Sequence, residues 1–223
     1  MKRSEINTIM REAVAFMKAN RFHLPPFAFW TKEDWANKGG EYDEIRDNML
    51  GWDITDFGEG NFKERGLLMF TIRNGNFSKE NYTKPYAEKL LITQEEQVTP
   101  FHYHWSKMED IINRGGGNLL VKIYNKTARD ELDMDADVRI SVDGRNYMAP
   151  AGTVVTLTPG ESITLPVGQY HSFWGEKGKG TVLVGEVSKV NDDNQDNRFL
   201  ENIGRFPEIE EDEAPLYLLY TDY

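Results

Sequence analysis

The chain has 223 residues, of which 39% are hydrophobic and 12% aromatic, and its formal net charge is −11. This composition suffices for one large domain with a buried core, and the negative charge argues against nucleic acid or an anionic membrane as a partner. The absence of cysteine excludes disulfides and thiolate ligands. The sequence contains no bilayer-length apolar run and no secretory signal pattern, so we expect a cytoplasmic location.

The N-terminal region predicts a helix followed by an aromatic arm. Apolar residues at helical spacing over residues 4–20 predict a surface helix with one buried stripe, with Ser4 as its N-cap and Asn20 at its end. In the segment FHLPPFAFW (residues 22–30), two prolines enforce an extended conformation. Its aromatic side chains need a surface to bury against, either the rest of the chain or a second subunit. Residues 31–35 carry a capping signal for a short helix.

From residue 53 onward, short β-type runs alternate with turn residues, which predicts a sandwich or a closed barrel. The Asn74-Gly75 and Asp143-Gly144 pairs are hairpin signals. The expected strands lie within residues 66–75, 88–105, 118–125, 137–149, 152–160, 161–168 and 180–188.

The tail after Asn191 is polar, then acidic over residues 208–215, then apolar over residues 216–220. We expect the acidic run to be a solvated face. The apolar run is short and aromatic, which favours one late strand.

The most informative feature is the group formed by His102, His104, Glu109 and His171. Three of the four histidines of the chain belong to this group. His102 and His104 are two positions apart, so on a strand they point to the same side of the sheet. Imidazole nitrogens combined with a carboxylate oxygen form a ligand set for a divalent transition metal. The pattern therefore predicts a metal site, whereas the fourth histidine, His23, has the context of an ordinary surface or core residue.

The first of these segments resembles the first motif of the cupin superfamily. The spacing of His102, His104, Glu109 and Gly116 matches that motif, while Glu96 occupies the position of its leading glycine. The departure falls on a turn and leaves the ligands intact.

The second segment resembles the second cupin motif. Gly160, Pro166, Gly168 and His171 match it, and Gly175 replaces its terminal asparagine. The resemblance covers about residues 85–190.

The cupin resemblance implies a mainly β fold, a cupin-type β-barrel or jelly roll with an N-terminal helical extension. We expect the helix and aromatic arm of residues 1–52 to pack on a barrel formed by residues 53–223. The barrel would have its core at residues 85–190 and a polar and acidic C-terminal tail, all within a single domain.

Over its whole length the chain is similar to the D-lyxose isomerase family within the cupins. The stretches FHYHWSKMEDIINRGGG, LPVGQYHSFWGE and GEVSKVNDDNQDNRF carry this closer match, together with the N-terminal helix and arm. The resemblance implies a manganese-dependent, homodimeric aldose–ketose isomerase. Its substrates would be free monosaccharides: D-lyxose and D-xylulose, and also D-mannose and D-fructose. A site of this type would tolerate other divalent transition metals such as Co²⁺.

Isomerisation moves a proton between C1 and C2 of the sugar, which requires a general base and acid besides the metal ligands. Glu186 is the candidate, because it shares one strand face with Val182 and Val184 and a carboxylate on an interior face needs a function or a partner. The alternative is that this face looks outward. Lys107, between two metal ligands in the sequence, is a candidate to supply a proton or neutralise an oxyanion. An exposed turn lysine is the alternative.

Four further residues are candidates for binding the sugar. Lys89 would reach the barrel mouth by its parity with Leu91, Asp193 and Arg198 lie in the polar tail, and Trp30 offers an aromatic ring for stacking. Three other functions remain open: an Fe(II)-dependent cupin dioxygenase with nearly the same ligands, a phosphosugar isomerase on the same barrel, and a non-catalytic sugar-binding cupin.

Overall fold

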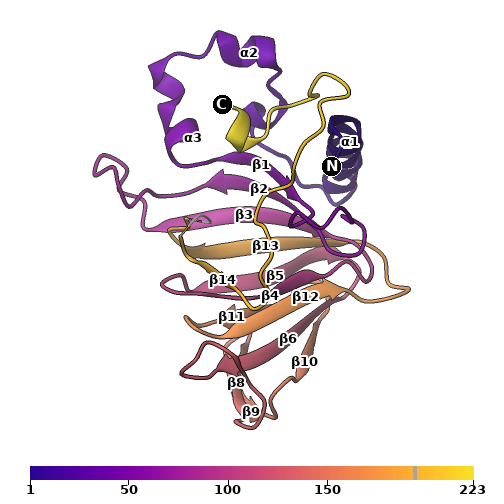
Figure 1. The fold of residues 1–223 in the computed structure, drawn as a ribbon, viewed down its shortest axis with the longest axis vertical. Helices are drawn as coiled ribbons and strands as arrows, with labels where there is room; N and C mark the ends of the chain where they lie inside the picture. The colour runs from indigo at the N-terminus through magenta and orange to yellow at the C-terminus, as the bar shows by residue number, and fades with distance from the viewer. Residues whose placement is uncertain (193–194) are drawn as a thin grey trace.

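The computed structural model describes residues 1–192 and 195–223, in which two antiparallel sheets curl against each other (Figure 1). The larger sheet has the strand order β1 (Gly51–Thr55), β2 (Leu67–Arg73), β3 (Tyr86–Thr93), β13 (Val182–Lys189), β5 (Glu109–Gly116), β11 (Ser162–Leu165), β8 (Val138–Val142) and β9 (Arg145–Ala149). The smaller sheet has the order β10 (Val154–Leu157), β6 (Leu119–Lys126), β12 (Tyr170–Gly175), β4 (Thr99–His104) and β14 (Asn197–Phe199), with β7 (Leu132–Asp133) beside β6. The prediction of a mainly β, cupin-type barrel with an N-terminal helical extension is confirmed.

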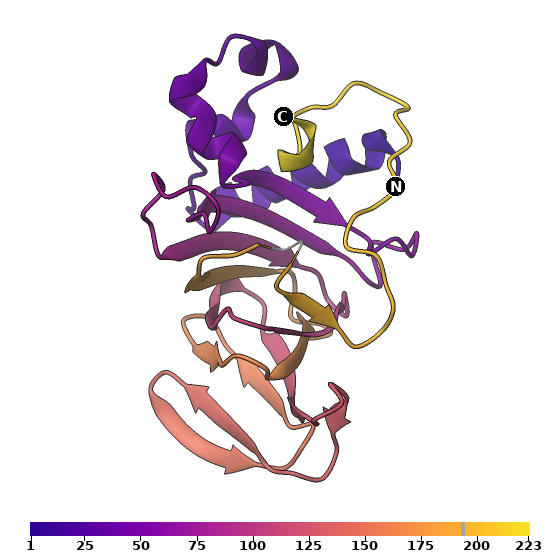
Figure 2. The same cartoon turned by 60° about the vertical axis from the view of Figure 1, so that its left-hand side comes forward.

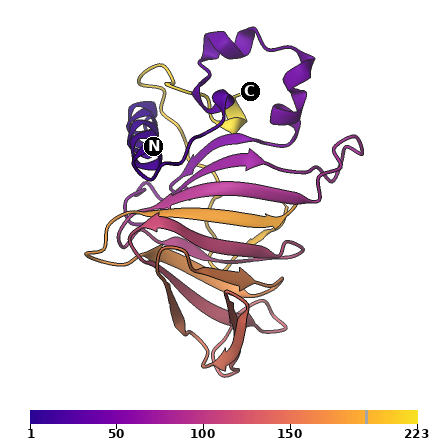
Figure 3. The same ribbon diagram turned by 180° about the vertical axis from the view of Figure 1, so that it is seen from behind.

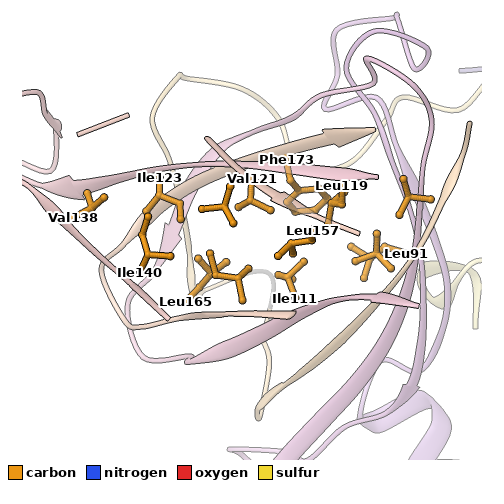
Figure 4. Close-up of a cluster of buried hydrophobic side chains, with 14 of the residues drawn as sticks. Leu91, Ile111, Leu119, Val121, Ile123, Val138, Ile140, Leu157, Leu165 and Phe173 are labelled. Atoms are coloured by element: carbon orange, nitrogen blue, oxygen red, sulfur yellow. The ribbon is translucent and has the colours of Figure 1, made fainter. Parts of the chain in front are cut away.

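The main core fills the space between the two sheets, because alternate residues of each strand face inward. On β13, Val182 and Val184 belong to this core, whereas Leu183 faces the opposite side of the sheet. Side chains from both layers meet in this core (Figure 4): Leu91, Ile111, Leu119, Val121, Ile123, Val138, Ile140, Leu157, Leu165 and Phe173.

A second apolar cluster covers the outer face of the larger sheet. Helix α1 (Arg3–Ala19) lies over the β1–β3 end of the molecule, seen from two further sides in Figures 2 and 3. The short elements η1 (Pro26–Phe29), α2 (Lys32–Ala36), η2 (Gly40–Tyr42) and α3 (Asp43–Asp47) continue this cover. Residues Ile6, Met10 and Met17 of α1 contribute to the cluster. Among the described helices, none combines the length and apolar character needed to cross a membrane.

Of the two predicted hairpins, one is confirmed and one is wrong. Strands β8 and β9 are joined at Asp143 and Gly144, both with positive φ, as a two-residue turn requires. Strands β2 and β3 do pair, but a loop of residues 74–85 joins them. The Asn74 side chain is buried and donates hydrogen bonds to the carbonyls of Asn48 and Asn191, so it anchors neighbouring segments instead of forming a tight turn.

The acidic C-terminal run is exposed, as expected from the sequence, and it also contacts the first turn of α1. The tail returns from β14 to α1, where the two termini lie near each other (Figure 1). Glu211 and Asp222 pair with the buried Arg3 guanidinium. The Asp212 carboxylate accepts hydrogen bonds from the Ser4 backbone N–H at 2.9 Å and its hydroxyl at 2.7 Å. The tail therefore supplies acceptors to the first turn of the helix.

This C-terminal contact explains two further differences from the sequence predictions. Helix α1 begins at Arg3 with Lys2 as N-cap, not at Ser4, because the tail satisfies the first-turn N–H groups. The apolar residues 216–220 do not form a strand; they pack on the helical face and lead into η3 (Tyr220–Asp222). The end of α1 at Asn20 and the Thr31 cap of α2 are as predicted.

Replacing Arg3 with methionine is expected to lower the free energy of unfolding by about 2 kcal/mol, since charge-assisted hydrogen bonds to two carboxylates are lost. Urea denaturation measures the change. The matched control is Lys177→Met, whose ion pair with Glu96 joins exposed side chains and should contribute less than about 1 kcal/mol. Equal stabilities of the two variants would contradict the account of the tail.

Candidate active site

The four predicted metal ligands lie together at one end of the barrel interior. His102 and His104 extend from β4, Glu109 is the first residue of β5, and His171 lies on β12 directly opposite His102. One ligand atom of each residue lies within 4.8 Å of the ligand atoms of the other three, and all four residues are buried. Residues far apart in the sequence thus converge as their spacing predicts.

Backbone carbonyls orient two of the imidazoles. Nδ1 of His102 lies 2.8 Å from the Pro100 carbonyl oxygen, and Nδ1 of His171 lies 3.0 Å from that of Gln169. A carbonyl only accepts, so Nδ1 carries the proton in each ring and Nε2 is left with a lone pair. A hydrogen bond from the ring nitrogen that does not bind the metal commonly fixes the orientation of a metal-binding histidine in this way.

The buried nitrogens of this group fit a cation. The Nε2 atom of His171 lies 3.1 Å from Oε1 of Glu109, with no hydrogen bond between them. A lone pair therefore faces a carboxylate oxygen, a repulsive contact that a metal ion between them would relieve. Both ring nitrogens of His104 are also buried without a hydrogen-bond partner, and its Nε2 lies 3.3 Å from the same carboxylate oxygen.

The electrostatic surroundings keep these groups in their metal-binding forms. Burial, with the neighbouring histidines, lowers the pKa of His102 well below its usual value, and burial together with the Lys107 charge lowers that of His104. Burial alone would raise the pKa of Glu109, but the Lys107 ammonium lowers it well below the usual range. Neutral imidazoles and an ionised carboxylate are the states that ligate a metal, so the residues present fit a divalent transition metal.

The two departures from the cupin motifs lie side by side, Glu96 in the turn before β4 and Gly175 at the end of β12. Glu96, in place of the leading glycine, has a φ of 58°, a left-handed conformation that glycine adopts more readily. Its N–H donates to the Gly175 carbonyl at 2.8 Å. A Cβ at Gly175 would lie 2.6 Å from the Gln94 carbonyl oxygen, so the close approach of these segments requires glycine there. The ligand positions are unaffected.

Glu186 and Lys107 form a buried ion pair beside the predicted ligands. Nζ of Lys107 lies 2.8 Å from Oε1 of Glu186 and 2.6 Å from Oε2 of Glu109. Glu186 is 4% exposed and Lys107 2% exposed, so the outward strand face and the exposed turn lysine are both excluded. Lys89, opposite Glu186 on β3, is also buried, and its Nζ lies 3.4 Å from Oε1 of Glu186.

A pocket joins the ligands His102, His104 and Glu109 to the Glu186–Lys107 pair. The residues that line it are Phe57, Leu67, Met69, Lys89, Leu91, Thr99, His102, His104, Lys107, Glu109, Ile111, Phe173, Glu186, Asn197, Phe199 and Arg205. Arg205 pairs with Asp53 of β1 at the edge of this space.

Sequence reasoning missed the pocket residues of the C-terminal segment. Asn197 and Phe199 line the pocket, because on β14 they lie opposite His104 and His102. Asn197 and Phe199 are two positions apart and therefore share one strand face, which was the available signal. The sequence does not show, however, how this strand is aligned with β4.

Two residues predicted to bind sugar, Arg198 and Trp30, lie away from the described pocket wall. Arg198 lies on β14 opposite Tyr103. Hydrogen bonds from Lys126 and Tyr103 lower the pKa of Asp130, and the Arg198 charge adds to this effect. Trp30 packs edge-on against other aromatic rings of the N-terminal arm. The structure brings neither Arg198 nor Trp30 to the described pocket wall, and Asp193 lies outside the described residues. Sugar binding by these three stays a prediction.

Comparisons with known proteins agree with this geometry. The chain is 49% identical to D-lyxose/D-mannose isomerase of Serratia proteamaculans and 47% identical to that of Escherichia coli O157:H7, in each case over 100% of this chain and 98% of the relative. Among solved structures, L-ribose isomerase of Cellulomonas parahominis with L-psicose has a similar fold, with a TM-score of 0.62 and 15% identity over 94% of this chain and 98% of that one. A family model described as D-lyxose isomerase matches residues 1–223. The chain therefore belongs to the D-lyxose isomerase family.

Proposed function

We propose that the chain is a metal-dependent aldose–ketose isomerase that interconverts D-lyxose and D-xylulose, and also D-mannose and D-fructose. The observation that carries the proposal is the buried Glu186–Lys107 pair, which lines the same pocket as His102, His104 and Glu109 of the ligand group. The names of the relatives, D-lyxose/D-mannose isomerase, support the choice of sugars.

The residues of the pocket divide the chemistry between them. A divalent metal held by His102, His104, Glu109 and His171 would supply Lewis acidity toward two neighbouring sugar oxygens. The Glu186 carboxylate accepts the proton from one carbon and returns it to the next, as a general base and then an acid.

Lys107 complements Glu186 electrostatically. Its ammonium lies between Glu186 and Glu109, where it favours the ionised form of Glu109 and can donate to an oxygen that gains negative charge. Lys89 contacts Glu186 from the neighbouring strand and restricts its orientation. The apolar wall, including Phe57 and Phe199, excludes water and strengthens these interactions.

The rival functions fit the pocket less well. A dioxygenase requires the metal ligands but not a buried acid–base pair beside them. A phosphosugar isomerase requires cations for the phosphate, yet Lys89 and Lys107 face Glu186, and Arg205 faces Asp53. An isomerase of free sugars accounts for both observations.

We further propose Mn²⁺ as the metal, with Co²⁺ as a substitute, since a mixed imidazole and carboxylate set accepts several divalent ions. A homodimer and a cytoplasmic location are part of the same proposal, supported by the family resemblance.

The test is to incubate the Mn²⁺-loaded protein with a panel of free pentoses and hexoses and to measure ketose formation. We expect turnover of D-lyxose and D-mannose, and none after the metal has been removed by chelation. A metal-loaded, folded protein that isomerises no sugar of the panel would overturn the proposal.

A further inference from the structure

Lys107 extends from a short loop to which β13 donates a backbone hydrogen bond, from the Lys189 N–H to the Met108 carbonyl at 3.1 Å. Residues 105–108 connect β4 to β5, between the ligands His104 and Glu109. In this loop Ser106 and Met108 are exposed, whereas the Lys107 side chain is buried in the pocket. A long, flexible side chain in this position needs its backbone fixed if the ammonium is to stay between two carboxylates.

Asp196 supplies this fixation. Its Oδ1 accepts hydrogen bonds from the Ser106 N–H at 2.8 Å and the Ser106 hydroxyl at 2.7 Å, and its Oδ2 accepts one from the Lys107 N–H at 3.0 Å. The Asp196 carbonyl also accepts a hydrogen bond from the Trp105 N–H at 3.2 Å. Asp196 itself is buried, 5% exposed, so these charge-assisted bonds are shielded from water.

The position of Asp196 connects two parts of the pocket. It immediately precedes β14, whose Asn197 and Phe199 form part of the pocket wall, and β14 lies beside β4 (Figure 1). Asp196 is not among the residues that line the described pocket. The hydrogen bonds of its carboxylate go to Ser106 and Lys107, so the carboxylate acts on the loop that carries Lys107.

We propose that Asp196 is a positioning residue, which holds the Lys107 ammonium between Glu109 and Glu186. The expected change in kcat rests on the proposed isomerase function, whereas the expected position of the Lys107 ammonium rests on geometry alone. Asp196→Asn is the sharpest variant, because it replaces one accepting oxygen by an NH₂ group that faces an N–H donor.

The expected result for Asp196→Asn is a fall in kcat of about 100-fold with metal content unchanged and KM within about twofold. Ser106→Ala, which leaves the bond to the Lys107 N–H, should lose far less. The matched control is Glu201→Gln, which removes a carboxylate of the same segment whose partner is Arg65 at the surface; its kcat should equal that of the wild type. If the Asn variant does not fold, Asp196→Glu, which moves the carboxylate by one methylene, has the same expectation.

A double-mutant cycle with Lys107→Met separates positioning from general destabilisation. In the Lys107→Met background, Asp196→Asn should change kcat by less than about twofold, because the group through which it acts is gone. An equal loss in both backgrounds, or wild-type kcat in the folded Asp196→Asn protein, overturns the proposal.

A crystal structure of the metal-loaded Asp196→Asn protein tests the geometry without turnover. We expect the Lys107 Nζ to leave its place between the two carboxylates; an unmoved Nζ overturns the inference. If the wild type isomerises no sugar, the proposed function fails, and this structure still decides the role of Asp196.

Discussion

Replacing Glu186 with glutamine is expected to lower kcat for sugar isomerisation by about 100-fold to 10,000-fold, the usual contribution of a general acid–base group. Glutamine keeps the shape of the side chain and an acceptor for Lys107 and Lys89, but it cannot take up a proton at neutral pH. Lys107 retains its ion pair with Glu109, so the substitution should leave the surroundings of the metal ligands unchanged. Steady-state kinetics with D-lyxose and metal analysis of the same sample measure the two quantities.

The control for this variant is Glu88→Gln. Glu88 lies on β3 next to Lys89 but pairs with Arg73 on the partly exposed face of the sheet. Its kcat should stay within about twofold of the wild type, since an exposed ion pair contributes little. Unchanged turnover by a folded, metal-loaded Glu186→Gln protein would exclude Glu186 as the acid–base group.

Replacing His171 with alanine is expected to abolish both metal retention and isomerisation. Loss of a residue that only hydrogen-bonds to a metal ligand already lowers metal affinity by about 10-fold to 100-fold. Loss of the ligand itself should lower the affinity further. Because a metal that binds only the folded state stabilises it, Mn²⁺ should raise the Tm of the wild type but not of His171→Ala. Metal analysis after dialysis and thermal unfolding with and without Mn²⁺ provide the measurements.

His23→Ala is the matched control for this loss, because His23 is exposed on the N-terminal arm. It should retain the metal, the Mn²⁺-dependent rise in Tm and full activity. Metal retention by His171→Ala equal to that of His23→Ala would contradict the assignment of His171 as a ligand.

The barrel and its ligand group were predictable from the sequence because their signals are local. The two-residue spacing of His102 and His104 and the alternation of Val182, Val184 and Glu186 each report a strand face directly. The structure places these residues on the faces that the alternation predicts.

The parts that could not be predicted depend on contacts between distant segments. The pairing of Arg3 with Glu211 and the anchoring of Asn74 by Asn48 and Asn191 have no local signal. Acidic side chains are expected to be solvated and an Asn-Gly pair favours a turn, so neither residue type indicates its distant partner. The register of β14, which brings Asn197 rather than Arg198 to the pocket, likewise depends on pairing with the distant strand β4 and could not be predicted from the sequence.

Conversion of D-lyxose in D₂O, followed by ¹H NMR with the Mn²⁺-loaded protein, tests the central claim most directly. D-Xylulose formed by proton transfer through Glu186 carries a solvent deuteron on C1 in every turnover in which the Glu186 proton exchanges before its return, whereas a hydride shift gives none. The account predicts ketose formation with deuterium on C1 of part of the product, and absence of any ketose would contradict the isomerase function.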